Sequence, residues 1–275
     1  MKEVTEKELR ETQLKMVVYI DEVCRKHNID YSLGGGSLLG AIRHKGYIPW
    51  DDDIDLMLTR KNYEALLTQL MEELPSYYSL IYYKVRETYL PFAKLYDNRT
   101  GFTSLLDTLN KGTGIFVDIF PMDIMPENAE ERENFKKQVQ QGAIKLVTSS
   151  SRGLSYASAS KWYYFLGKMI LWLPSHLKNA GKNRDIAEQV DCLMQKYENT
   201  SADGIGYVYS GYKTEYFPRE IFIDYEDVEF ENFQFRKIKN HDCYLTTLYG
   251  NYMQLPPENK RVNHSYYKWY WKESL

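Results

Sequence analysis

Two N-terminal segments carry hydrophobic residues at helical spacing. Residues 5–27 place their apolar positions on one stripe, and Thr5 and Glu8 have the spacing of a capping box, which satisfies free N–H groups at a helix start. Thr59 is the predicted N-cap of a second helix that ends at Leu74. Both helices are expected to cover a sheet. The two stripes consist of Leu9, Met16, Val17, Ile20 and Val23, and of Tyr63, Leu66, Leu67 and Leu70.

Short apolar or alternating runs predict strands between and after these helices. Asn240 is a predicted N-cap of a last helix, which ends at Gly250. This mixture predicts an α/β (α+β) fold, with a mixed sheet and flanking helices. The predicted strands are residues 29–33, 53–58, 77–85, 91–96 and 115–120, followed by a hairpin of residues 227–230 and 233–236.

The middle of the chain is predicted to be helical. Charged, aromatic and mixed stretches cover residues 127–149, 161–173 and 180–197. The predicted organisation is a catalytic core over residues 1–125, a helical insert or subdomain over 126–203, and C-terminal strands and a helix over 204–275 that complete the catalytic domain.

The aromatic stretch 161–173 is too short to span a membrane, and Lys168 interrupts it. Packing against the rest of the protein is the favoured interpretation, because aromatic stripes usually face inward. Peripheral contact with a membrane surface is the alternative, since the aromatic residues lie between Lys161 and Lys178.

Asp51, Asp52, Asp53 and Asp55 place four carboxylates within five positions. Such groups repel each other unless one is protonated, water screens them, or a cation binds between them. In an alternating strand Asp53 and Asp55 point to the same side. Oxygen ligands of this kind suit Mg²⁺ or Mn²⁺. A solvated acidic loop is the alternative interpretation.

A glycine turn precedes these acids. Gly34, Gly35 and Gly36 follow a short apolar run, and Ser37 opens a segment that is predicted to form a short helix. A strand, a glycine turn and a helix start expose backbone N–H groups to an anion such as phosphate. Taken alone, the glycines would indicate only a tight turn.

The segment GGSLLGAIRHKG, at residues 35–46, and its continuation IPWDDDID, at 48–55, resemble the signature of the LicD family of phosphocholine transferases, which is related to the fukutin-type enzymes. Residues 116–123 and 248–257 are also similar to that family. The resemblance implies a nucleotidyltransferase-type fold. Ser37 stands where many relatives have threonine, and Asn251 stands where an acid is expected.

The resemblance also implies site residues. Gly36 and Ser37 would contact the donor phosphates, with Gly35 beside them, while Asp53 and Asp55 would bind the metal. A third acid on a later strand usually completes such sites. Asp53, Asp55 and this third acid form the predicted catalytic and metal-binding set, and Gly35, Gly36 and Ser37 belong to the predicted donor-binding set.

Asp118 is the candidate third acid. It lies in the apolar run 115–120, where a carboxylate needs a partner. A structural role in capping a turn before Pro121 is the alternative. Asp123 has a weaker claim, because it is predicted to lie in a loop beyond the proline.

Three basic residues are candidates for binding the donor. Arg43 and Lys45 lie between the glycine turn and the acids, and either would neutralise phosphate. Ordinary solvated helix charges are the alternative, above all for Lys45. Lys94 lies in a strand-like run and is expected to pair with phosphate or with one of the acids.

Composition narrows the class of protein. The 275 residues carry a net charge of −3 and a pI near 6.0, which argues against a nucleic-acid binder. The cysteines, three in number and far apart, are typical of reduced thiols. The charged N-terminus lacks an export signal. We therefore expect a cytoplasmic protein, or one at the inner face of the membrane.

The function implied by the resemblance is metal-dependent transfer of a phosphoryl-linked group from a CDP-linked donor. The transfer of phosphocholine from CDP-choline to a hydroxyl of a cell-surface glycan, a lipid-linked glycan or a teichoic-acid precursor, with release of CMP, is the leading case. Trp50 is a candidate wall for the choline by position. The alternatives are a nucleotidyltransferase that uses NTP and an inactive nucleotide- or carbohydrate-binding protein.

Overall fold

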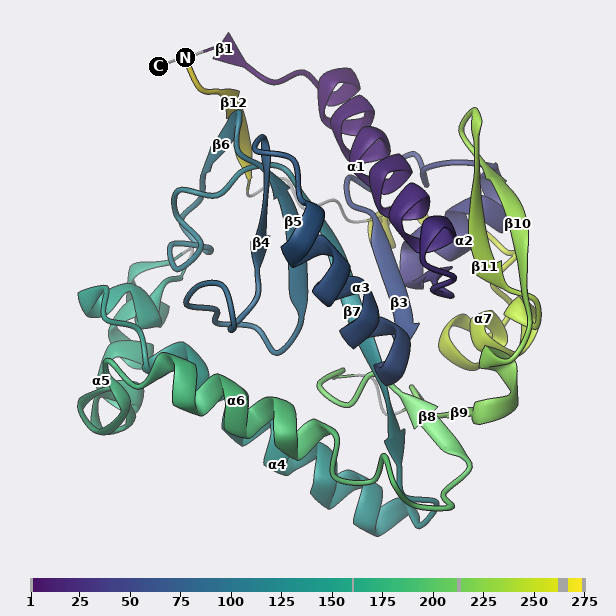
Figure 1. The fold of residues 1–275 in the computed structure, drawn as a ribbon. Coiled ribbons are helices and arrows are strands. Elements are labelled where there is room, and N and C mark those ends of the chain that lie inside the picture. Colours follow the sequence, from purple (N-terminus) through teal and green to yellow (C-terminus); the bar gives the residue numbers. More distant parts are fainter. Residues whose placement is uncertain (1, 160, 212–213, 262–266, 274–275) are drawn as a thin grey trace.

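The computed structural model describes residues 2–159, 161–211, 214–261 and 267–273, and its centre is a mixed sheet (Figure 1). The strand order is β2-β3-β7-β5-β4, and β3 and β7 are parallel while the other neighbours are antiparallel. Two short strands, β8 and β9, extend the sheet from the far end of β7. The strands are β2 (Ser32–Leu33), β3 (Asp55–Thr59), β7 (Phe116–Met125), β5 (Ala93–Asp97), β4 (Tyr78–Ile81), β8 (Gly204–Gly206) and β9 (Phe217–Pro218).

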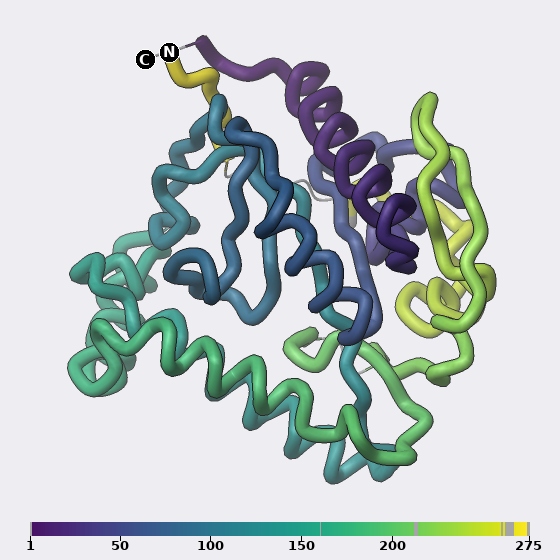
Figure 2. The backbone as a smooth tube through the Cα atoms, in the orientation of Figure 1, coloured from purple at the N-terminus to yellow at the C-terminus, as the bar shows by residue number. Residues whose placement is uncertain are grey.

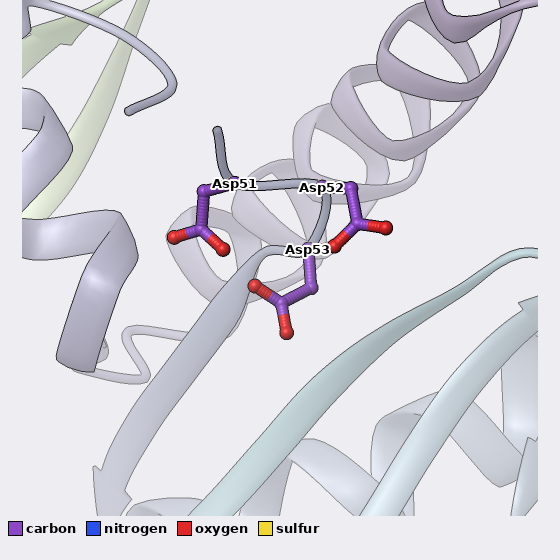
Figure 3. A group of neighbouring side chains, drawn as sticks. All are labelled: Asp51, Asp52 and Asp53. Carbon is purple, nitrogen blue, oxygen red and sulfur yellow. The ribbon is translucent and has the colours of Figure 1, made fainter. Parts of the chain in front are cut away.

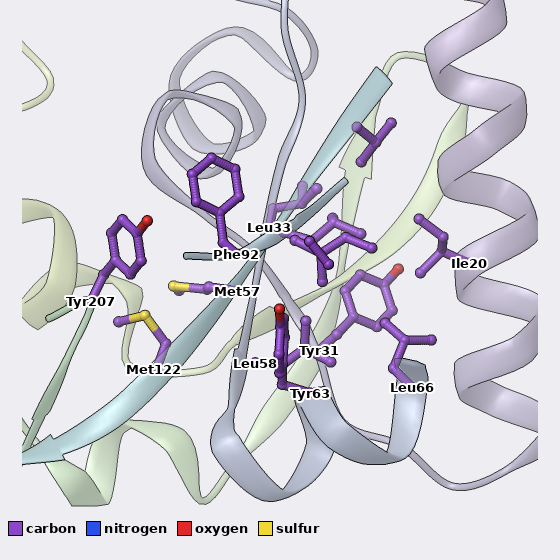
Figure 4. Close-up of a cluster of buried hydrophobic side chains, with 14 of the residues drawn as sticks. Ile20, Tyr31, Leu33, Met57, Leu58, Tyr63, Leu66, Phe92, Met122 and Tyr207 are labelled. Carbon is purple, nitrogen blue, oxygen red and sulfur yellow. The ribbon is translucent and has the colours of Figure 1, made fainter. Parts of the chain in front are cut away.

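Helices α1 (Glu6–Lys26) and α3 (Arg60–Glu73) cover one face of the sheet, as the apolar stripes predict. The capping box of Thr5 and Glu8 is present at the start of α1. Figure 4 shows how alternation divides the strand side chains: Leu58 faces the helices, and Met57 lies on the opposite side. The helix-covered side forms the main core, and the opposite side is left to line a site.

Further elements surround this sheet. Helix α2 (Gly35–His44) follows β2 directly, and α7 (His241–Tyr249) contacts it. The predicted hairpin is confirmed as β10 (Tyr225–Phe230) and β11 (Phe233–Ile238). A small sheet joins β1 (Lys2–Glu3), β12 (Lys268–Trp271) and β6 (Thr100–Thr103), so the two ends of the chain lie side by side. The 3-10 turns are Gly153–Ala157, Arg219–Phe222 and Glu258–Lys260.

The middle of the chain is helical. Helices α4 (Ala129–Thr148) and α6 (Asn183–Met194) run side by side, and α5 (Trp162–Asn179) lies at one end of this pair (Figure 2). Arg60 connects α6 to the sheet: its buried guanidinium pairs with Asp123 of β7 and with Asp191 of α6.

The predicted α+β fold class is confirmed, and the local predictions for Asp123 and Asp53 are wrong. Asp123 does not lie in a loop, because β7 continues through Pro121 to Met125. Proline is tolerated there although it donates no hydrogen bond to the ladder. Asp53 does not lie in the predicted strand, because β3 begins at Asp55. The aromatic stretch packs against the rest of the protein, as expected, but on one side only, since none of the residues of α5 is fully buried. Its inner side packs against α4 and the 3-10 turn Gly153–Ala157, and its outer side is exposed.

Candidate active site

Asp55, Asp118 and Lys94 form a row across three strands. Asp55 of β3 pairs in register with Asp118 of β7, which pairs in register with Lys94 of β5. Residues in register on neighbouring strands project from the same face of the sheet. The Lys94 ammonium lies 2.8 Å from Oδ1 of Asp118. Asp118 thus has the partner that a buried carboxylate requires, and it sits inside a strand rather than at a turn.

The two carboxyl groups of this row, those of Asp55 and Asp118, are buried away from water. Burial raises the pKa of Asp118 to about 6, although the Lys94 ammonium opposes this shift. Burial, followed by the charges of Asp53 and Asp118, raises the pKa of Asp55 well above its ordinary value. Both shifts express the free-energy cost of burying carboxylate charge, to which the neighbouring acids add, and a bound divalent cation would offset this cost.

A second group of carboxylates lies just before β3. Asp51, Asp52 and Asp53 offer oxygen atoms that lie within 4.8 Å of one another (Figure 3). Helix α1 holds this loop, because Gln13 Nε2 donates to the Asp52 carbonyl at 2.9 Å and Arg10 Nη2 donates to the Asp51 carbonyl at 3.2 Å. The sequence contains no motif that identifies these two anchoring residues.

Asp53 connects the two acidic groups. It lines a cavity of about 200 Å³ together with Asp52, Lys94 and Asp118. The charge of Asp53 also contributes to the raised pKa values of both Asp55 and Asp118. The structure therefore gathers the predicted acids in one region, and their all-oxygen donor set fits Mg²⁺ or Mn²⁺. Their roles as ligands stay predictions.

The glycine turn is built against these acids. The N–H of Gly34 donates to the Asp55 carbonyl at 2.9 Å, and the Ser37 hydroxyl accepts from the Asp55 N–H at 2.9 Å. Gly35 has a φ of +47°, and a Cβ on Gly36 would lie 2.6 Å from Oδ2 of Asp51. Helix α2 begins at Gly35, two residues before the predicted start. Its N-terminus and the carboxylates thus share one corner, where phosphate and metal could be held together.

Two of the predicted basic residues contact other parts of the protein. Arg43 lies in the last turn of α2, and Lys45 is the C-cap of this helix. Arg43 Nη1 donates to the Tyr252 carbonyl at 2.8 Å, and the Lys45 ammonium lies 3.3 Å from Glu229. Their predicted contacts with donor phosphate stay predictions. The Arg261 guanidinium lies over the ring of Trp50, which does not line the aromatic cavity described next.

A larger cavity, of about 400 Å³, opens beside the glycine turn on the same face of the sheet. We call it the aromatic cavity. Sequence reasoning missed half of its walls, because these come from the segment after β8 and from α7, which are far from the acid motif in sequence. The only sequence signal was the density of tyrosines around residues 207–209. The lining residues are Gly34, Gly35, Gly36, Asp55, Met57, Phe92, Phe120, Met122, Tyr207, Tyr209, Ser210, Gly211, Glu215, Tyr244, Leu248 and Tyr249.

Comparison with known proteins agrees with this geometry. Residues 28–146 match the model of the LicD/FKTN/FKRP nucleotidyltransferase domain, which includes the glycine turn and the acids of β3 and β7. The lipopolysaccharide cholinephosphotransferase LicD of Haemophilus influenzae is 31% identical over 272 residues, which cover 96% of this chain and 97% of the relative. An uncharacterised protein of Rickettsia prowazekii is 42% identical over 52 residues, or 19% of each chain. The similarity to the Haemophilus protein, which extends over nearly the whole chain, and the family match show that this chain belongs to the LicD family.

Proposed function

We propose that this protein is a Mg²⁺-dependent cholinephosphotransferase that moves phosphocholine from CDP-choline to a hydroxyl of a surface glycan and releases CMP. The family and the name of the Haemophilus relative support the class of reaction. The register that places Asp55 beside Asp118, next to the glycine turn, is the single observation on which the site assignment rests.

In the proposed reaction the acceptor oxygen forms a bond to the β-phosphorus of the donor, and the bond from that phosphorus to the oxygen of CMP breaks. A Mg²⁺ ion held by Asp53, Asp55 and Asp118 would neutralise the diphosphate charge. The N–H groups at the start of α2 would orient the phosphates. Asp118 would accept the proton of the acceptor hydroxyl, since its pKa of about 6 suits a general base near neutral pH.

The test is product analysis with a panel of CDP-linked choline, ethanolamine, glycerol and ribitol. We expect CMP and a phosphocholine-modified glycan from CDP-choline, and loss of both with EDTA or in Asp53→Asn and Asp55→Asn. Release of pyrophosphate from NTP would favour the nucleotidyltransferase alternative. Nucleotide binding that ignores Mg²⁺ and yields no product would favour an inactive binding protein.

We also propose that the outer side of α5 rests on the inner, anionic surface of a membrane that carries the acceptor. Trp162, Ile170 and Leu177 of this side are 74%, 69% and 74% exposed. Lys161 and Lys178 bracket the helix, which contains no acidic residue, so its charge complements anionic lipid. In the part of the chain that the structure describes, helices that could cross a membrane are absent. The outer stripe is Trp162, Leu166, Ile170, Leu173 and Leu177.

Flotation with phosphatidylglycerol vesicles tests this contact. We expect the protein to float with these vesicles and not with phosphatidylcholine vesicles, and we expect Ile170→Asp to abolish flotation. Leu105→Asp is the matched control, because Leu105 is 73% exposed and lies outside α5. Failure of the unaltered protein to float, or self-association through α5 in light scattering, would overturn the proposal.

A further inference from the structure

The aromatic cavity extends from the glycine turn into the protein. Gly35, Gly36 and Asp55 are among its lining residues, and the proposed function places the donor phosphates beside them. Its remaining walls consist mainly of aromatic rings and methionine side chains. The group that is joined to the β-phosphate of the donor would enter this space, so the cavity walls would select the group that is transferred.

We propose that the aromatic cavity binds the trimethylammonium group of choline and thereby selects choline among CDP-linked donors. This inference rests on the proposed function, and it assigns a specificity site to residues outside the acid and glycine motifs. The volume of about 400 Å³ lies within the range of small-molecule sites.

Three rings form the wall on the sheet side. The ring of Phe120 lies 4.5 Å from that of Phe92 and 4.9 Å from that of Tyr207, measured between centroids. Figure 4 shows Phe92, Tyr207, Met57 and Met122 together on the side of the sheet away from the helices. Aromatic faces attract a cation through the ring quadrupole, and they do so most strongly where water is excluded.

The charges of the cavity favour a cation. Asp55 and Glu215 are acidic, and none of the described residues that line the cavity is a lysine or arginine. Glu215 is only 8% exposed, and its carboxylate is hydrogen-bonded to Ser210. The buried Lys136 of α4, which does not line the cavity, balances part of the charge of Glu215.

The lining discriminates between donor head groups. A trimethylammonium group needs no hydrogen bonds, whereas a primary ammonium needs up to three acceptors. Glycerol and ribitol would bury several hydroxyls against phenylalanine and methionine, which leaves polar groups unsatisfied.

The test measures binding of phosphocholine and of its neutral carbon isostere, 3,3-dimethylbutyl phosphate, by calorimetry in the presence of MgCl₂. We expect phosphocholine to bind at least roughly tenfold more tightly than the isostere. Tyr249→Leu and Phe120→Leu should each weaken phosphocholine binding by roughly 3- to 30-fold and change the affinity for CMP little. Tyr77→Leu is the matched control, since Tyr77 and Tyr249 are both 42% exposed and Tyr77 lies outside the cavity.

Glu215→Gln separates charge from shape. We expect it to weaken phosphocholine binding while leaving binding of the neutral isostere unchanged. Equal affinity for phosphocholine and the isostere, or the same affinities in the cavity variants as in Tyr77→Leu, would overturn the assignment of the cavity. Phosphocholine binding without any CMP release from CDP-choline would instead overturn the proposed reaction and leave the cavity assignment standing.

Discussion

The buried pair of Arg60 and Asp123 holds together the two strands that carry the site. Arg60 follows β3 directly, and Asp123 lies in β7, five residues beyond Asp118. Arg60 Nε and Nη2 donate to the two oxygens of Asp123 at 2.6 and 2.8 Å, and the two residues are 2% and 0% exposed. The pair therefore fixes the same strand register that brings Asp55 beside Asp118.

Replacement of Arg60 by methionine leaves the Asp123 carboxylate buried without its cation. Removal of one partner of such a pair costs about 3–5 kcal/mol of unfolding free energy. For a chain of this size that corresponds to a fall in Tm of roughly 10 °C. The double variant Arg60→Met with Asp123→Leu should recover most of the loss, because two apolar side chains need no compensation.

The pH dependence of the unfolding free energy tests whether the buried Asp123 carboxylate causes the loss of stability in Arg60→Met. Burial raises the pKa of Asp123 to about 6 from 3.8, so the stability that this group contributes is complete below about pH 4 and is lost as the pH rises through about 6. Arg60 lowers this pKa, so its removal raises the pKa further and keeps Asp123 protonated at pH 5. Urea unfolding should therefore show a larger loss for Arg60→Met at pH 8 than at pH 5. An equal loss at both values would refute the reasoning.

Three further predictions concern the acids and the turn. Asp55→Asn should abolish CMP release without lowering Tm, because the substitution removes a carboxylate whose charge is costly through burial and through the neighbouring acids. Asp185→Asn, on the exposed side of α6, should retain activity. Gly36→Ala should weaken Mg²⁺ binding in calorimetry, since the added Cβ would lie 2.6 Å from Asp51 Oδ2, whereas Gly167→Ala meets open space and should change nothing. Excess MgCl₂ at about 100 times its Kd should stabilise the protein by about 2.7 kcal/mol. This gain should be smaller at pH 5 than at pH 8, because carboxyls with raised pKa values must lose protons to bind metal; a Tm that ignores MgCl₂ would contradict it.

The local part of the site could be predicted because its determinants are local. Alternation predicts that Asp55 lies on the face opposite to Leu56 and Leu58, and the glycine turn precedes it in sequence, although β3 begins only at Asp55 and Asp53 lies in the loop before it. The pairing of Lys94 with an acid such as Asp118 could also be predicted, because a charged residue in each of two apolar strands needs a partner of opposite charge. These inferences use only strand periodicity and the cost of burying charge.

The remaining parts depend on contacts that periodicity does not report. Asp123 was predicted to lie in a loop because of Pro121, but the pairing of β7 with β3 and β8 carries the strand past the proline. Glu215 lies outside every recognised motif, and only the packing of the segment after β8 against the sheet brings it to the cavity. For α5, the composition indicated an aromatic stripe, but it did not indicate which side of the helix would pack against α4.

The glycine turn and the acids behave as one structural unit, which explains why the two motifs occur together in the sequence. Ser37 and Gly34 each hydrogen-bond the backbone of Asp55, so the turn fixes the start of β3. In return, the carboxylates of Asp51 and Asp55 occupy the space that side chains on Gly36 and Gly35 would need. A side chain at either glycine would displace a carboxylate, and loss of either hydrogen bond would free the strand that carries Asp55. The proposed phosphate and metal sites at this corner are therefore mechanically coupled, and a substitution in the turn should impair binding at both.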